Sequence, residues 1–281
     1  MARKRYLWKV RSREIQLGDR TLLVGVLNVT PDSFSDGGKY LDPDRACEQA
    51  LAMEEQGADL IDVGAESTKP ASKPVTEEDE WRRLAPVLKR LRGKLTIPIS
   101  VDTYKSAVAE RALDLGVEVI NDPTGLTYDP LLAKTLTQYD AGIILNHMRG
   151  TPETWARLPG LTDPGTTVSA DLQAAVHRAR HSGMDMTRIV IDPGLGFGKR
   201  KEENSRLIAD LPRLRALDLP IMAGPSRKSF LNQSTPEGLL IGTAAAVTAC
   251  ILGGVHLVRV HDVAQMATVA QIADAVEKFL P

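Results

Sequence analysis

Cysteine is scarce in this chain of 281 residues, with only Cys47 and Cys250 present. Both lie in apolar patterns typical of buried helices, and no CxxC spacing occurs, which argues against a disulfide framework or a redox pair. The N-terminus is basic but no apolar run follows it, so we expect no signal peptide. These absences predict buried, reduced thiols and a cytoplasmic protein.

An excess of charge of either sign is also lacking. Lys and Arg number 35 against 36 Asp and Glu, a formal net charge of −1, so no basic surface for nucleic acid is expected. The longest apolar stretch, residues 239–258, is interrupted by Gly253 and Gly254 and predicts a buried helix followed by a buried strand, not a membrane span. The sequence therefore predicts neither a nucleic-acid nor a membrane partner.

What is present is a regular alternation of apolar, strand-like runs with helical patterns. Near-continuous apolar strands are typical of a parallel sheet covered on both faces. No low-complexity linker divides the chain, and no GxGxxG follows the first strand, which disfavours the alternative of a doubly wound open sheet. The fold class is therefore α/β, and the count and length favour a single (β/α)8 TIM barrel over residues 21–281.

The expected barrel strands cover residues 21–29, 58–64, 97–102, 117–122, 141–147, 189–192, 220–224 and 257–261. The expected helices cover residues 42–56, 76–94, 105–115, 129–139, 169–182, 202–217, 241–252 and 263–279. Residues 1–20 stand apart, because two short runs, 6–10 and 13–17, predict a β-hairpin. We expect this extension to plug the N-terminal face of the barrel.

A long polar loop follows the first barrel strand. Residues 28–38 read Asn-Val-Thr-Pro-Asp-Ser-Phe-Ser-Asp-Gly-Gly, a loop longer than a structural turn needs. It holds an amide, hydroxyls, two carboxylates and an aromatic ring, so it predicts contact with a ligand.

Charged or amide side chains mark nearly every predicted strand end, and active sites of this fold lie at the strand C-termini. Carboxylates beside an amide suit a flat heterocycle with an amino-amide edge, because each N–H needs an acceptor in a dry pocket. Arg, His and Asn suit a phosphate-bearing group. The expected acceptors are Asp102, Asn121 and Asp192, and the expected donors or positive groups are Asn28, Lys228, Arg259 and His261.

Other polar residues have plainer interpretations. Asp62 and Asp262 could equally cap the helices that follow them. The run Gly194-x-Gly196-x-Gly198-Lys199 lacks the Walker spacing and indicates close passage of the backbone beside a ligand. His147 is more typical of a core or rim position, and no HExxH or Cys–His set indicates zinc.

Taken in order, these segments resemble the dihydropteroate synthase family; they are residues 27–38, 62–68, 100–103, 120–122, 147–150, 192–199, 226–230 and 259–262. The resemblance implies an enzyme that joins 4-aminobenzoate to 6-hydroxymethyl-7,8-dihydropterin diphosphate by SN1-like loss of pyrophosphate, giving 7,8-dihydropteroate. It implies Mg2+ as cofactor, sulfonamides as inhibitors, and a homodimer formed through the last helices.

The resemblance also implies roles for individual residues. The pterin set is Asp102, Asn121, Asp192, Met148, Phe197, Gly224, Lys228 and Arg259, and the diphosphate set is Asn28, Thr68, Arg259 and His261. The aminobenzoate enclosure is Phe34, Ser67, Thr68, Lys69, Pro70 and Ser229, with Asn28 as metal ligand. The catalytic set is Asp36, Asn28, Lys228, Arg259 and His261.

The second loop departs from the family pattern at two positions, with Lys69 for Arg and Ala71 for Gly. Lys keeps the charge but loses the bidentate fork, and Ala removes a freely turning glycine, which leaves sulfonamide sensitivity open. Two alternatives remain. One is a methyltetrahydrofolate-binding corrinoid methyltransferase domain, which shares the barrel and a pterin pocket; the other is a non-catalytic paralogue that binds a pterin without turnover.

Overall fold

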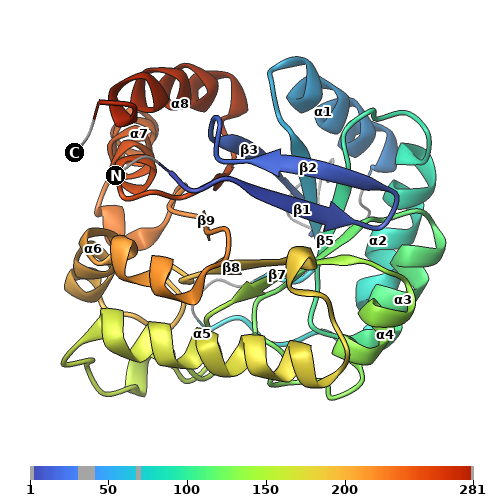
Figure 1. Cartoon of the computed structure of the whole chain (residues 1–281). Helices are drawn as coiled ribbons and strands as arrows, with labels where there is room; N and C mark the ends of the chain where they lie inside the picture. The colour runs from blue at the N-terminus through green and yellow to red at the C-terminus, as the bar shows by residue number, and fades with distance from the viewer. Residues whose placement is uncertain (1–2, 31–41, 68–70, 280–281) are drawn as a thin grey trace.

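The computed structural model describes residues 3–30, 42–67 and 71–279. The predicted loop residues Phe34, Asp36, Thr68, Lys69 and Pro70 lie outside these ranges. Eight parallel strands form one sheet in the order β8-β7-β6-β5-β4-β3-β10-β9. A parallel bridge between Ile191 and Ile221 joins the two ends of this order. The result is the predicted, nearly closed barrel with helices around it (Figure 1).

All eight predicted barrel strands are found, and most are shorter than predicted at their first residues. They are β3 (Leu22–Asn28), β4 (Leu60–Gly64), β5 (Ile99–Asp102), β6 (Val119–Asp122), β7 (Gly142–Asn146), β8 (Ile189–Asp192), β9 (Met222–Ala223) and β10 (Leu257–Val260). The helices are α1 (Pro43–Glu55), α2 (Glu77–Leu91), α3 (Ser106–Asp114), α4 (Leu132–Gln138), α5 (Pro164–His181), α6 (Lys201–Ala209), α7 (Pro236–Leu252) and α8 (Val263–Glu277).

Two helices begin five residues before their predicted starts, because polar caps rather than apolar periodicity set those starts. Asp163 accepts a hydrogen bond from the Thr166 backbone and precedes Pro164 at the first turn of α5. Thr235 does the same for Gly238 before Pro236 in α7. Proline is favoured at this position because its missing N–H has no partner there in any case.

The predicted helix over residues 202–217 is divided. Helix α6 ends at Ala209, and a 3₁₀ segment, η3 (Leu211–Leu217), follows it. Pro212 cannot donate to the carbonyl four residues earlier and its ring clashes with that carbonyl, so a regular helix cannot continue through it. Shorter 3₁₀ turns are η1 (Trp155–Arg157), η2 (Met186–Arg188) and η4 (Ser229–Leu231).

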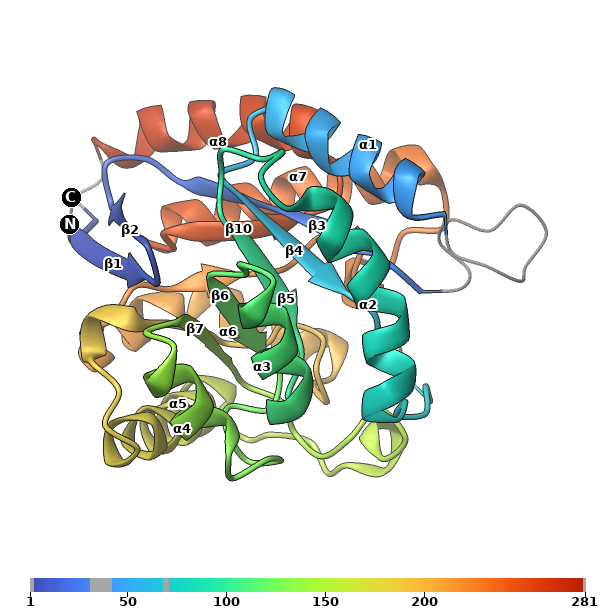
Figure 2. The same ribbon diagram turned by 90° about the vertical axis from the view of Figure 1, so that its right-hand side faces the viewer.

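The N-terminal residues form the predicted hairpin of β1 (Tyr6–Val10) and β2 (Arg13–Leu17). Trp8 is 1% exposed, and its indole nitrogen donates to the Arg188 carbonyl at 3.0 Å. A Cβ atom on Gly142 would lie 2.7 Å from a Val10 methyl, so glycine lets the hairpin approach the start of β7. Figure 2 shows the hairpin at the end of the barrel opposite the arrowhead of β4, which confirms the predicted plug.

Inside the barrel, apolar and polar layers follow one another along the strands. The hairpin residues pack with the first inward-facing residues of the strands, which are Leu22, Val24, Leu60, Val119, Ile144, Val190, Met222 and Leu257. Two residues further along β4, β6, β7, β8 and β10 come Asp62, Asn121, Asn146, Asp192 and Arg259. Because side chains alternate along a strand, these polar residues face the same interior space.

Both cysteines are buried and unpaired, as predicted. The apolar stretch 239–258 forms most of α7 and the start of β10. Within the described ranges, no helix is both long and apolar enough to cross a membrane.

Candidate active site

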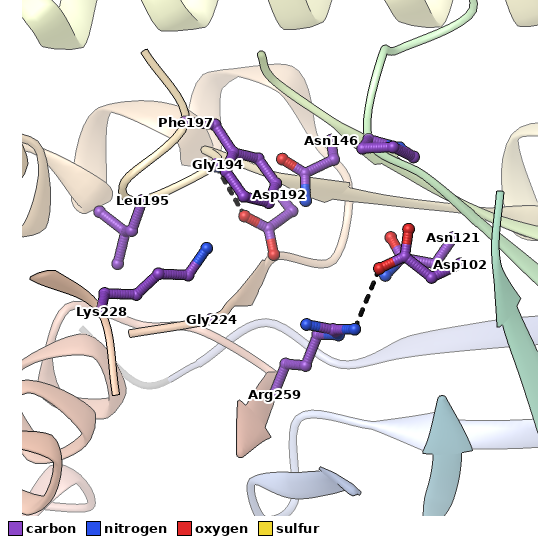
Figure 3. A pocket seen from close by; sticks show the side chains of 11 residues that line it. Asp102, Asn121, Asn146, Asp192, Gly194, Leu195, Phe197, Gly224, Lys228 and Arg259 are labelled. Atoms are coloured by element: carbon purple, nitrogen blue, oxygen red, sulfur yellow. Dashed lines mark hydrogen bonds and ion pairs between the residues drawn. The ribbon is translucent and has the colours of Figure 1, made fainter. Parts of the chain in front are cut away.

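A polar pocket opens at the C-terminal end of the barrel, where loops leave the strands (Figure 3). Its lining residues come from β5 to β10 and the segments that follow them: Asp102, Asn121, Pro123, Asn146, Asp192, Gly194, Leu195, Phe197, Gly224, Lys228 and Arg259. The structure therefore brings together every residue of the predicted pterin set except Met148. Met148 instead lines a neighbouring cavity with His147, Asp171 and Arg178.

The two carboxyl groups of this pocket are poorly solvated. Burial raises the pKa of Asp102 to about 7, against the opposing effect of Arg259. Burial raises the pKa of Asp192 to about 6, although its Oδ1 accepts a hydrogen bond from the Gly194 backbone at 2.7 Å. Poorly solvated carboxylates with free lone pairs favour a ligand that brings N–H donors.

Two cations face these carboxyl groups. Arg259 donates from Nη2 to Asp102 at 3.0 Å (Figure 3). The Lys228 ammonium lies 3.8 Å from the centroid of the Phe197 ring, and burial together with Arg259 lowers its pKa to about 8. A Cβ atom on Gly196 would lie 3.1 Å from Lys228 Cδ, so the glycine leaves room for this side chain. The pocket thus offers both acceptors for N–H groups and positive charge for an anionic group.

The glycine-rich run forms one wall of the pocket. Gly194, Gly196 and Gly198 all have positive φ, and a Cβ atom on Gly194 would lie 1.8 Å from the His147 carbonyl oxygen. Lys199 donates to the carbonyls of His147, Gly194 and Phe197 at 3.2, 2.6 and 3.2 Å. Its ammonium therefore binds the loop to the end of β7 and is not free to hold a phosphate.

The remaining predicted residues lie around this end of the barrel. His261 Nδ1 is 3.0 Å from Ser226 Oγ, and burial lowers its pKa to about 3, which keeps the ring neutral. Asn28 is exposed at the end of β3, paired in register with Gly64. Ser229 is exposed on η4, and Ser67 is half-buried with its carbonyl accepting from Ser72 Oγ at 2.5 Å.

The start of the second loop is fixed by a buried charge cluster. Lys105 Nζ lies 2.6 Å from a Glu66 oxygen and 2.5 Å from a Glu80 oxygen, and Tyr104 donates to the other Glu66 oxygen at 2.7 Å. Further along the loop, Ala71 has φ +65°, a conformation in which a glycine would be less strained. Alanine in place of the family's glycine at position 71 therefore strains the backbone.

The two ambiguous aspartates have different roles. Asp262 forms an ion pair with Arg227 and makes no side-chain cap for α8. Asp62 is fully buried and bonds to Ser100, Asn121 and Arg259.

His147 is buried, with Nε2 3.0 Å from Asp171, in agreement with the core or rim interpretation. Asn146 lines the pocket, although no role was predicted for it. The signal that would have found both Asp62 and Asn146 is their spacing, two residues after an inward apolar residue on the same strand.

A sequence profile of the family described as "Pterin binding enzyme" matches residues 24–261. The dihydropteroate synthase of Synechocystis sp. is 43% identical over 265 residues, which cover 92% of this chain and 91% of that protein. The solved Xanthomonas albilineans dihydropteroate synthase with 4-aminobenzoic acid has a TM-score of 0.90 at 36% identity, covering 99% of this chain and 100% of that one. The Yersinia pestis dihydropteroate synthase in a sulfonamide drug complex has a TM-score of 0.90 at 33% identity, covering 97% and 99%.

The barrel and its polar pocket, together with that profile, define a pterin-binding enzyme. More narrowly, the chain belongs to the dihydropteroate synthase family.

Proposed function

We propose that this protein joins 4-aminobenzoate to 6-hydroxymethyl-7,8-dihydropterin diphosphate, forming 7,8-dihydropteroate and pyrophosphate. The observation that carries the proposal is the pocket with Asp102, Asn121 and Asp192 as acceptors and Lys228 and Arg259 as cations. Its acceptors match the N–H groups of a pterin amino-amide edge, and its cations match the attached diphosphate. The related X. albilineans enzyme was solved with 4-aminobenzoic acid, which supports the second substrate.

In this mechanism the pocket holds the pterin while the bond between its side-chain carbon and the diphosphate oxygen breaks. The electron pair leaves with pyrophosphate, and the ring shares the positive charge that remains on carbon. The charges of Lys228 and Arg259 would stabilise the departing anion, an electrostatic contribution that is largest in a dry site. The neutral His261 ring would contribute a hydrogen bond and not a charge. The neutral arylamine then forms the C–N bond and loses a proton, so no strong general base is needed.

Mg2+ is part of the proposal, with Asn28 as its protein ligand. A Cβ atom on Gly64 would lie 3.9 Å from Asn28 Oδ1 and 3.8 Å from Asp102 Oδ2, so the amide stands beside the pocket rim. Among the described residues, no group of three or more His, Cys, Asp or Glu could hold a metal. One amide oxygen nevertheless fits Mg2+, which commonly takes one or two protein ligands together with substrate phosphates. The bound ion would neutralise charge on the leaving group.

We also propose a homodimer in the cytoplasm. Helices α7 and α8 border an apolar groove, and Ile272 on its wall is 62% exposed. The buried, unpaired cysteines support a reducing compartment. Ile272→Asp should shift the protein from dimer to monomer in sedimentation velocity while an exposed polar control, Gln271→Asp, leaves it dimeric. If Ile272→Asp and Gln271→Asp have the same oligomeric state, this interface is contradicted.

The decisive experiment is pyrophosphate release by the purified protein with both substrates and Mg2+. The proposal predicts release that depends on 4-aminobenzoate and is blocked by a sulfonamide, as the drug complex of the Y. pestis relative suggests. Release that the drug does not block would keep the synthase activity and implicate Lys69 and Ala71 in resistance. Pterin binding without product would favour the non-catalytic paralogue, and methyl transfer to a corrinoid would favour the methyltransferase alternative.

A further inference from the structure

The carboxylate of Asp62 organises the pocket without lining it. Asp62 lies in the middle of β4 and is fully buried. Its Oδ1 accepts from Ser100 Oγ at 2.6 Å, and its Oδ2 accepts from Asn121 Nδ2 at 3.0 Å and from Arg259 Nε at 2.6 Å. Two of these three donors belong to the pocket lining, so one buried group is bonded to side chains from two other pocket strands.

This contact fixes which end of the Asn121 amide faces the ligand. The Asp62 carboxylate is paired with the Arg259 guanidinium and its Oδ2 accepts hydrogen bonds, so the NH2 group of Asn121 is the end that faces Asp62. The amide oxygen then points away, and Asn121 Oδ1 is buried without a hydrogen-bond partner in the described structure. A buried acceptor without a partner destabilises a protein unless a ligand supplies a donor.

Asp62 orients Arg259 in the same way. The guanidinium uses Nε for the buried Asp62 and Nη2 for the partly buried Asp102, so two carboxylates from neighbouring strands hold its plane. Within residues 3–30, 42–67 and 71–279, its hydrogen bonds use only Nε and Nη2, so Nη1 is left for an anion. Asp62 therefore sets the direction of one acceptor and one cation in the pocket.

We propose that Asp62 is a positioning residue that determines the hydrogen-bond pattern of the site. It holds Asn121 as an acceptor and thereby selects heterocycles that present an N–H, not a lone pair, at that point. The inference rests on the proposed function, because a pterin is the ligand whose N–H groups it would select.

The test compares Asp62→Asn with Ser100→Ala. In Asp62→Asn the new amide can donate to Asn121 Oδ1, which allows the Asn121 amide to rotate and face the pocket with its NH2. Ser100→Ala is the matched control, since it removes one hydrogen bond from Asp62 Oδ1 but leaves both Oδ2 contacts. Calorimetry measures the affinity for 6-hydroxymethylpterin and for analogues of the same size. Each analogue has one N–H replaced by a group that cannot donate a hydrogen bond.

For the wild-type protein, one analogue should bind roughly tenfold or more weakly than the parent pterin, which marks the N–H that Asn121 receives. In Asp62→Asn the parent should bind roughly tenfold more weakly, and the penalty for that one analogue should nearly vanish. Ser100→Ala should keep the wild-type pattern. The inference is overturned if Asp62→Asn shows the same losses of affinity for the analogues as the wild type. It is also overturned if Ser100→Ala loses the wild-type pattern as well.

Two further observations separate the outcomes. If the wild-type protein binds none of these pterins, the proposed function fails before the role of Asp62 is tested.

If Asp62→Asn does not fold, a crystal structure of the wild-type pterin complex decides the role of Asp62. Asn121 Nδ2 still bonded to Asp62, with Oδ1 on a ligand N–H, supports the inference; an amide rotated so that Nδ2 contacts the ligand overturns it.

Discussion

The barrel interior has two layers built from the same strands. The lower layer, next to the hairpin, is apolar, and the upper layer, next to the pocket, is polar. Near the N-terminal face, Leu60, Val119 and Val190 pack with the hairpin in an apolar layer. One side-chain repeat further on, about 7 Å along each strand, Asp62, Asn121 and Asp192 are buried polar groups. The lower layer therefore supplies stability. The upper layer holds unsatisfied polar atoms such as Asn121 Oδ1, which destabilise the free protein and favour ligand binding.

The largest expected effect is in the lower layer. Trp8→Ala should lower the free energy of unfolding by about 3 to 5 kcal/mol, because it opens a cavity under the hairpin. Urea denaturation measures the loss. In the protein that stays folded, kcat/KM should be unchanged. A parallel loss of activity in fully folded protein would show that the two layers are not independent.

The next effect is in the upper layer. Asp192→Asn keeps an acceptor for the Gly194 backbone but removes the charge that faces the ligand, so kcat/KM should fall roughly a hundredfold. The melting temperature should not fall, since burial opposes the ionised form of this group. Val190→Ala, two residues earlier on the same strand, is the matched control and should destabilise the protein while leaving kcat/KM intact. A loss of stability without loss of activity in Asp192→Asn, or a loss of activity in folded Val190→Ala, would contradict the division into layers.

The smallest effect is the dependence on pH. Burial raises the pKa of Asp102 to about 7 and lowers that of Lys228 to about 8. Binding needs the first ionised and the second protonated, so kcat/KM should rise up to about pH 7 and fall above about pH 8. A steady-state profile of kcat/KM for the pterin substrate measures both limbs. A profile that stays flat through both pKa values would show that these groups do not control binding.

The sequence predicted the barrel and most of the pocket because strand ends in this fold converge by geometry. It missed the starts of α5 and α7, since those are set by the caps Asp163 and Thr235 and not by apolar periodicity. It left Asp62 undecided, because a strand-end aspartate is equally consistent with a helix cap. Only the three-dimensional contacts with Asn121 and Arg259 separate those possibilities.

The most direct test of the two-layer interior is a crystal structure with bound 6-hydroxymethylpterin, which cannot lose pyrophosphate. We expect the pterin ring in the upper layer, with its N–H groups roughly 3 Å from Asp102, Asn121 and Asp192. A pterin found only in the neighbouring cavity beside His147 and Met148, with the upper layer unchanged, would contradict it.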